Sequence, residues 1–83
     1  MKNKINQFDN KGKLVGCWET YHSNGKIWFK GNYDLNGKRV GYWEFYYRNG
    51  KIWGKGNFEN GKRVGYWEFY YPNGQLKHRE YYI

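Results

Sequence analysis

The chain has 83 residues, of which 24% are aromatic and 12 are glycine, and its 15 Lys and Arg against 7 Asp and Glu give a formal net charge of +8. A chain of this length forms one small domain at most, in which only about 60–65% of the unfolded surface can be buried. Its single cysteine excludes an intramolecular disulfide, and no stretch is apolar enough for a membrane span or a signal-peptide core, so we expect a cytoplasmic protein or one whose export signal has been removed.

One stretch of the sequence occurs twice without change. NGKRVGYWEFYY spans residues 36–47 and again residues 60–71, and a diverged copy, KGKLVGCWETYH, spans residues 11–22. A fixed spacing of this size marks a repeat protein. We therefore divide the single domain, residues 1–83, into an N-terminal strand near 3–9 and three repeats near 11–35, 36–59 and 60–83.

Each repeat contains two short β-rich runs separated by Asn-Gly, which is the strongest local signal for a β-hairpin with a type I′ turn. The repeats are joined by further glycine-containing turns, of two residues at Asn60-Gly61 and of three residues at 10–12 and 35–37. The predicted fold class is all-β: a single-layer, curved antiparallel meander built from three hairpin repeats. Its seven strands are expected near residues 3–9, 13–22, 27–34, 38–47, 52–59, 62–71 and 76–82.

The predicted turns also define the register of the hairpins. In the second hairpin they place Glu44 opposite Lys55 and Trp43 opposite Gly56, and the same acid–base pair returns in the other two hairpins as Glu19–Lys30 and Glu68–Arg79. Large rings that lie over strand glycines let a sheet curl toward their face. This face, called the inner face, is expected to hold Trp18, Phe29, Tyr33, Trp43, Phe45, Ile52, Phe58, Trp67, Phe69 and Leu76, with Gly16, Gly31, Gly41, Gly54, Gly56 and Gly65.

The second hairpin carries a recognisable motif. Residues 41–52 read Gly-Tyr-Trp-Glu-Phe-Tyr-Tyr-Arg-Asn-Gly-Lys-Ile, which resembles the pattern G-x-W-x-x-Y-x-x-N-G-x-[IL] of the variant MORN repeat. The resemblance covers nearly the whole chain from Lys11. It implies a curved sheet of stacked hairpins and non-enzymatic roles in scaffolding, dimerisation or phospholipid binding. Bacterial proteins with this repeat are often described as antitoxin-like. Two departures in the third copy, Glu80 for Gly56 and Pro72 for Arg48, are interpreted as capping of the terminal repeat.

The residues give no sign of catalysis, and we expect no enzyme activity and no cofactor. The three repeated Glu–Lys/Arg pairs are interpreted as a cross-strand charge ladder, because they come with no nucleophile and no odd partner. His22 and His78 match no spacing of metal ligands, and both are expected on the inner face near the Asn-Gly turns. Cys17 occupies the place of Tyr42 and is interpreted as an ordinary strand residue.

The outer face is predicted to carry the binding surface. Rings on both faces of a single layer cannot all be covered, and exposed tyrosine, tryptophan and arginine are frequent hot spots of protein interfaces. The first hypothesis is a non-catalytic, antitoxin-like inhibitor that binds and blocks a larger protein, with an effector that processes nucleic acid as one candidate partner. The predicted partner-binding residues are the outer pairs Tyr21–Trp28 and Tyr46–Trp53, extended by Tyr70 and bordered by Arg48 and Lys51.

A second hypothesis assigns the excess of positive charge to direct binding of nucleic acid, nucleotide or anionic lipid. Its anion-binding residues would lie at the edge opposite the Asn-Gly turns: Lys11, Arg39 and Arg63. The two edge strands of the sheet leave backbone groups unpaired, so a monomer and an edge-to-edge homodimer are equally compatible with the sequence.

Overall fold

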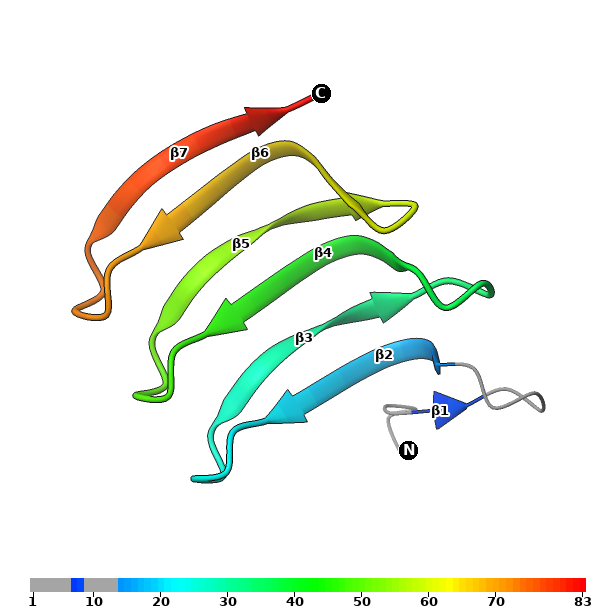
Figure 1. The fold of residues 1–83 in the computed structure, drawn as a ribbon, viewed down its shortest axis with the longest axis horizontal. Coiled ribbons are helices and arrows are strands. Elements are labelled where there is room, and N and C mark those ends of the chain that lie inside the picture. The colour runs from blue at the N-terminus through cyan, green and yellow to red at the C-terminus, as the bar shows by residue number, and fades with distance from the viewer. Residues whose placement is uncertain (1–6, 9–13) are drawn as a thin grey trace, which may run out of the picture.

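The computed structural model describes Gln7, Phe8 and residues 14–83, which form an open antiparallel sheet (Figure 1). Every strand pairs with its neighbours in chain order, so the sheet is a meander. The predicted all-β single layer is confirmed, and the rest of the N-terminal strand expected at 3–9 lies outside the described residues. The strands are β1 (Gln7–Phe8), β2 (Leu14–Tyr21), β3 (Ile27–Tyr33), β4 (Arg39–Tyr46), β5 (Ile52–Glu59), β6 (Lys62–Tyr70) and β7 (Leu76–Tyr82).

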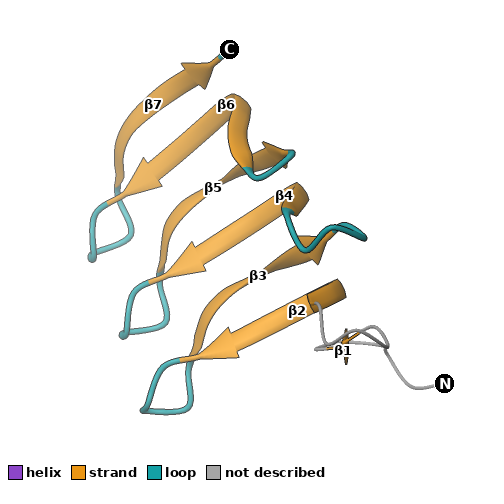
Figure 2. Ribbon diagram, turned by 45° about the vertical axis from the view of Figure 1, so that its right-hand side comes forward, coloured by secondary structure: helices purple, strands orange, loops and turns teal. Residues whose placement is uncertain are grey.

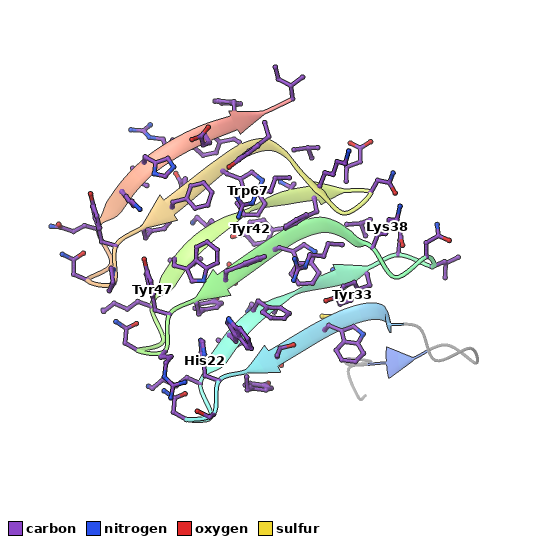
Figure 3. All side chains as sticks on the ribbon, in the orientation of Figure 1. His22, Tyr33, Lys38, Tyr42, Tyr47 and Trp67 are labelled. Atoms are coloured by element: carbon purple, nitrogen blue, oxygen red, sulfur yellow. The ribbon has the colours of Figure 1, made fainter. Side chains whose placement is uncertain are left out.

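The sheet is a stack of three bent hairpins, β2–β3, β4–β5 and β6–β7. Their turns line up along one edge of the molecule, and the connections between repeats line up along the other (Figures 1 and 2). Figure 3 shows His22 and Tyr47 beside the hairpin turns and Lys38 at the opposite edge. No described residue belongs to a helix that could cross a membrane. β7 is an edge strand, and the homodimer considered from the sequence stays a prediction.

The hairpin turns differ from the prediction by one residue. The amide of Gly50 donates to the carbonyl of Tyr47 at 2.9 Å, and the amide of Tyr47 donates to the carbonyl of Lys51 at 2.8 Å, which closes a three-residue loop. Only the glycine of this loop is left-handed, with φ of 89°, whereas a type I′ turn would need positive φ at Asn49 too. The asparagine instead uses its side chain, whose Oδ1 accepts from the amide of Lys51 at 2.8 Å. The prediction of type I′ hairpin turns is therefore wrong.

A β-bulge compensates for the longer loop. Tyr46 pairs with Ile52 but Phe45 pairs with Gly54, so Trp53 is the extra residue and Glu44 still faces Lys55 as predicted. A bulge turns its extra side chain out of the strict alternation of the strand. Trp53 consequently packs against the inner-face core, with its ring centroid 5.2 Å from that of Phe45.

The same bulge occurs at Trp28 in the first hairpin, between the pairs Thr20–Phe29 and Tyr21–Ile27. The predicted outer pairs Tyr21–Trp28 and Tyr46–Trp53 are thus wrong, because each tryptophan lies on the other face from its tyrosine.

The extra loop residue also pairs Ile52 with Tyr46 and Leu76 with Tyr70. Cross-strand partners share a face, so Ile52 and Leu76 belong to the outer face and not to the inner one.

The connections at 35–37 and 60–61 match their predicted lengths, and the one predicted at 10–12 lies outside the described residues. Asn60 and Gly61 both have positive φ, 55° and 83°, as a type I′ turn requires, and residues 35–37 form a three-residue loop. Each connection is followed by a bulge, at the left-handed Gly41 in β4 and at the left-handed Gly65 in β6. The register shows the bulge in β6, where Lys55 pairs with Glu68 but Asn57 pairs with Val64. This bulge adds two residues to β6. Because side chains alternate between faces with a period of two, an even number leaves the later residues on their predicted face. The predicted inner-face positions of Trp67 and Phe69 are confirmed.

The core lies on the inner face and consists of the buried side chains Trp43, Phe45, Phe58, Trp67 and Phe69. The rings cover glycines as expected, but Trp43 and Trp67 each cover a glycine of the preceding repeat. A Cβ on Gly31 would lie 2.1 Å from Cδ2 of Trp43, and one on Gly56 would lie 2.3 Å from Cδ2 of Trp67. Gly16, Gly41 and Gly65 have open space around them and serve through their positive φ instead.

Polar contacts between repeats accompany this packing. The indole of Trp67 donates to the carbonyl of Asn57 at 3.0 Å, and Nδ2 of Asn49 donates to the carbonyl of Pro72 at 2.9 Å. The hydroxyl of Tyr47 donates to the carbonyl of Tyr70 at 2.7 Å. The motif residues therefore fix the repeats to one another.

Candidate interaction site

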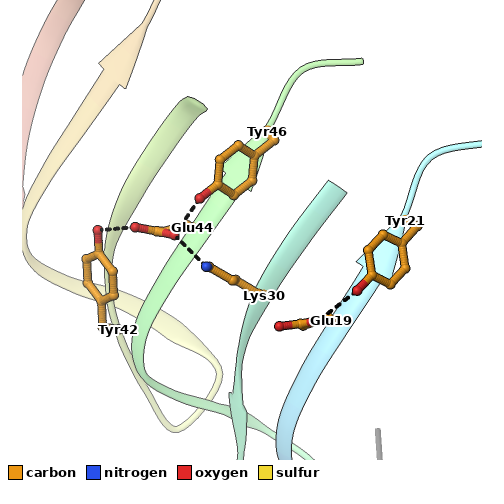
Figure 4. A network of polar contacts seen from close by, with 6 residues as sticks. All are labelled: Glu19, Tyr21, Lys30, Tyr42, Glu44 and Tyr46. Carbon is orange, nitrogen blue, oxygen red and sulfur yellow. Dashed lines mark hydrogen bonds and ion pairs between the residues drawn. The ribbon is translucent and has the colours of Figure 1, made fainter. Parts of the chain in front are cut away.

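The outer face is dominated by glutamates held between tyrosines (Figure 4). The hydroxyls of Tyr42 and Tyr46 donate to the two carboxylate oxygens of Glu44 at 2.9 and 2.5 Å, and Nζ of Lys30 lies 3.5 Å from Oε1. The next repeat has the same arrangement around Glu68, with Tyr66 and Tyr70 at 2.7 and 2.6 Å and Lys55 at 3.7 Å. In the first repeat Tyr21 donates to Glu19 at 2.7 Å, and Cys17 takes the place of the second tyrosine.

The charge ladder is thus present, and its ion pairs run between repeats. The predicted Cα partners Glu19–Lys30, Glu44–Lys55 and Glu68–Arg79 are confirmed. Among the described residues, however, the lysines form their ion pairs with the glutamate of the following repeat, as Lys30–Glu44 and Lys55–Glu68. The ladder therefore contributes to stacking of the repeats as well as to each hairpin.

The tyrosines change the acidity of these groups. Burial raises the pKa of Glu44, but the hydrogen bonds from Tyr46 and Tyr42 and the charge of Lys30 outweigh it, so the pKa lies below the ordinary value. Hydrogen bonds from Tyr70 and Tyr66 lower the pKa of Glu68 in the same way. These carboxylates are held ionised, which is the opposite of what a general acid needs.

The outer face has two shallow hollows that repeat one another. One, of about 380 Å³, is lined by Cys17, Glu19, Lys30, Gly31, Tyr42 and Glu44. The other, of about 290 Å³, is lined by Tyr42, Lys55, Gly56, Asn57, Tyr66 and Glu68. Their charged groups belong to the ladder, and no group of three or more potential metal ligands occurs among the described residues.

A third hollow lies on the inner face and combines rings with arginines. It measures about 320 Å³, and we call it the inner groove; its lining is Trp28, Phe29, Arg39, Phe45, Trp53, Phe58 and Arg63. Trp28 keeps 45% of its surface exposed although it stacks on His22, whose ring centroid lies 5.2 Å away. The inner groove is therefore the place where aromatic surface and positive charge meet.

Two stacked arginines define the chemistry of the inner groove. The guanidinium of Arg39 lies 4.9–5.5 Å from the ring centroids of Phe29, Trp43, Phe45 and Phe58. That of Arg63 lies 5.0 Å from Trp67 and 5.3 Å from Phe69. Cation–π contacts of this kind stabilise an arginine without neutralising it. Within the described part of the chain neither guanidinium has a carboxylate within 4.0 Å.

The predicted site residues do not form one surface. Tyr21, Tyr46 and Tyr70 lie on the outer face against glutamates, whereas Trp28 and Trp53 border the inner groove. Arg48 and Lys51 are exposed at the hairpin turns, where Nη2 of Arg48 donates to Oγ of Ser23 at 3.1 Å.

Of the alternative anion-binding set, Lys11 lies outside the described residues. Arg39 and Arg63 lie at the start of β4 and β6, at the edge opposite the hairpin turns as predicted, and their guanidiniums lie over the inner-face rings. A signal for this placement was present in the sequence. Arg39 is in phase with Trp43 and Phe45, since side chains alternate with a period of two along a strand.

Comparison with known families agrees with this architecture. A model of the MORN repeat variant matches residues 14–35, 39–60 and 63–83, and the chain therefore belongs to the MORN repeat variant family. MORN repeats are non-enzymatic and generally serve as modules for interaction with proteins or membranes. No curated protein and no solved structure matches the chain significantly.

Proposed function

We propose that this protein is a non-catalytic, antitoxin-like inhibitor that binds a larger protein partner across the inner face of its sheet. The observation that supports the proposal most directly is the inner groove, where the half-exposed Trp28 and the partly buried Trp53 adjoin two arginines that have no carboxylate partner among the described residues. Tryptophan, tyrosine and arginine are the residues most enriched among interface hot spots. The outer tyrosines are less suited to this role, because their hydroxyls are already bonded to glutamates.

The dimensions of the sheet are sufficient for such a partner. The molecule extends 41 Å by 35 Å along its two longer axes. A face of that size can contribute the approximately 800 Å² that each protein buries in an interface of standard size. Inhibition would follow from covering a functional surface of the partner, as the resemblance to antitoxin-like repeat proteins suggests.

The proposal is tested by capture of the partner with matched variants of the full chain. Immobilised wild-type protein, Trp53→Ala and the outer-face control Tyr46→Phe are exposed to lysate of the source cells, with and without nuclease. We expect nuclease-resistant capture of one protein by the wild type and by Tyr46→Phe, and a loss of about 2 kcal/mol or more in affinity for Trp53→Ala. Circular dichroism checks that both variants keep the sheet.

The inhibitory role is tested by expressing the captured protein in a foreign host with and without this chain. Relief of a growth defect by the wild type but not by Trp53→Ala supports inhibition through the inner face. Unchanged capture by a folded Trp53→Ala variant would refute the inner-face assignment, and capture that disappears with nuclease would refute a protein partner.

A further inference from the structure

We infer that the inner groove binds an extended acidic segment of a polypeptide, whose carboxylates lie three residues apart and contact Arg39 and Arg63. The inference rests on the proposed function and specifies the partner. Its starting point is the separation of charge between the two faces. From β3 to β6 the glutamates of the ladder lie on the outer face, whereas the inner groove contains two arginines and no acidic residue. An occupant must therefore supply negative charge.

The orientation of the arginines favours carboxylates over nucleobases. The aromatic rings that the guanidiniums overlie already have one face occupied, and the two indoles at the border are partly covered, Trp28 by His22 and Trp53 by Phe69. Few ring faces are left for base stacking. The guanidinium N–H groups can still donate to a ligand. Their planar arrangement allows two parallel hydrogen bonds to one carboxylate.

The state of each arginine fits this role. Nε of Arg39 is buried without a hydrogen-bond partner, and one terminal nitrogen of Arg63 donates to the hydroxyl of Tyr82 at 3.1 Å, so a carboxylate would contact the remaining nitrogens of each guanidinium. Stacking on rings fixes both side chains before a ligand arrives. A side chain that is already ordered loses little conformational entropy on binding, which raises affinity.

The repeat sets the spacing of the acidic groups. Arg39 is on β4 and Arg63 on β6, at equivalent places in two repeats, with β5 between them. Two strand spacings amount to about 9.6 Å. An extended segment in the polyproline II conformation makes one turn in three residues and advances about 9.3 Å, so its side chains at i and i+3 point the same way. Acids at positions i and i+3 therefore match the two arginines. The segment would cross the strands, with the side chains between the acids against Trp53 and Phe58.

A helical segment fits less well. A helix needs about seven residues to advance the same 10 Å and measures about 10–12 Å across with its side chains. The inner groove holds only about 320 Å³, which suits a few side chains of an extended segment. We therefore commit to the extended segment, and the helical arrangement becomes one arm of the test.

The test uses the full wild-type chain and synthetic peptides of identical composition without tryptophan. Each peptide contains two glutamates and one leucine, and the glutamates stand at i,i+3, at i,i+5 or, in a helix-forming peptide, at i,i+7. Binding is followed through the intrinsic fluorescence of the protein's tryptophans at low and at moderate salt. We expect the i,i+3 peptide to bind about tenfold more tightly than the others, the ratio that corresponds to about 1.4 kcal/mol.

Variants then assign the contact. Arg63→Gln should lower the affinity for the i,i+3 peptide about tenfold and make all three peptides equivalent, whereas the turn variant Arg48→Gln should change it less than about twofold. Polydeoxythymidine and vesicles rich in phosphatidylserine are included as competing probes. Equal binding of the peptides to the wild type, absence of binding, or tighter binding of either competing probe would overturn the inference.

The outcomes separate the two proposals. Spacing-independent binding, together with capture of a protein that depends on Trp53, would leave the proposed function standing and remove only the acidic segment. Loss of both results would remove the inner face as a binding surface altogether.

Discussion

At Gly56 the space for a side chain is already occupied by the indole of Trp67. A Cβ there would lie 2.3 Å from the ring, and the buried indole is held by its bond to Asn57. We expect Gly56→Ala to destabilise the protein by at least about 1–3 kcal/mol, the usual cost of overpacking. Gly50→Asn is the control: its Cβ would meet only the flexible stem of Lys26, at 3.4 Å, and asparagine tolerates a left-handed backbone better than most residues. Urea unfolding measures both, and equal stabilities would contradict the close approach.

We expect the hydrogen bond from Tyr46 to Glu44 to make the free energy of unfolding depend on pH. Because the pKa of Glu44 is lowered in the folded state, its ionisation stabilises the fold above the unfolded value of about 4.3, and this contribution is lost as the pH falls through the lowered pKa. Tyr46→Phe removes one donor, so the difference in unfolding free energy between neutral and acidic pH should become smaller. Tyr71→Phe, at an exposed tyrosine, should leave the pH profile unchanged. Identical profiles for Tyr46→Phe and the wild type would refute this role of the tyrosine.

The hairpin as an element shows what the sequence could and could not predict. The pairing of Glu44 with Lys55 was predicted correctly although the turn type was wrong, because the longer loop and the bulge at Trp53 shift the register by one residue in opposite directions. The face of Trp53 could not be predicted, because an asparagine-glycine pair is compatible with both loop lengths. The inner-face core was predictable, since the bulges at Gly41 and Gly65 add an even number of residues and preserve the alternation.

The three hairpin turns provide a matched test of contacts between repeats. Oδ1 of Asn24, Asn49 and Asn73 accepts in each case from a backbone amide two residues on. Nδ2 of Asn24 and Asn49 also reaches a carbonyl of the next repeat, at 2.8 and 2.9 Å, whereas Asn73 has only a 3.4 Å contact with Gln75. We therefore expect Asn24→Ala and Asn49→Ala to cost about 0.5–1.5 kcal/mol more than Asn73→Ala, the net value of one hydrogen bond. Equal losses on thermal or urea unfolding would show that the contacts between repeats add no stability.

For the molecule as a whole, the stability should grow with the number of repeats. Each interface between repeats has the same parts: a tryptophan over a glycine, an ion pair of the ladder and an asparagine bridge. Stability in such an array is approximately a sum of repeat and nearest-neighbour terms. Because Asn36-Gly37 and Asn60-Gly61 are identical and precede the same residues, a second copy of residues 36–59 can be inserted after Glu59 with a native-like junction.

The inserted repeat should add one complete interface. Its tryptophan would lie over Gly56 as Trp67 does now, and its own glycine would receive the ring of Trp67. We expect the unfolding free energy to rise by about 1.5–3 kcal/mol or more, the value of burying one large aromatic side chain, with a larger dependence on urea because more surface is exposed on unfolding. Deleting residues 36–59 should lower both quantities. An insertion that leaves stability unchanged would show that the stacked tryptophans do not couple the repeats, and the same experiment would then count against the inner face as the organising core.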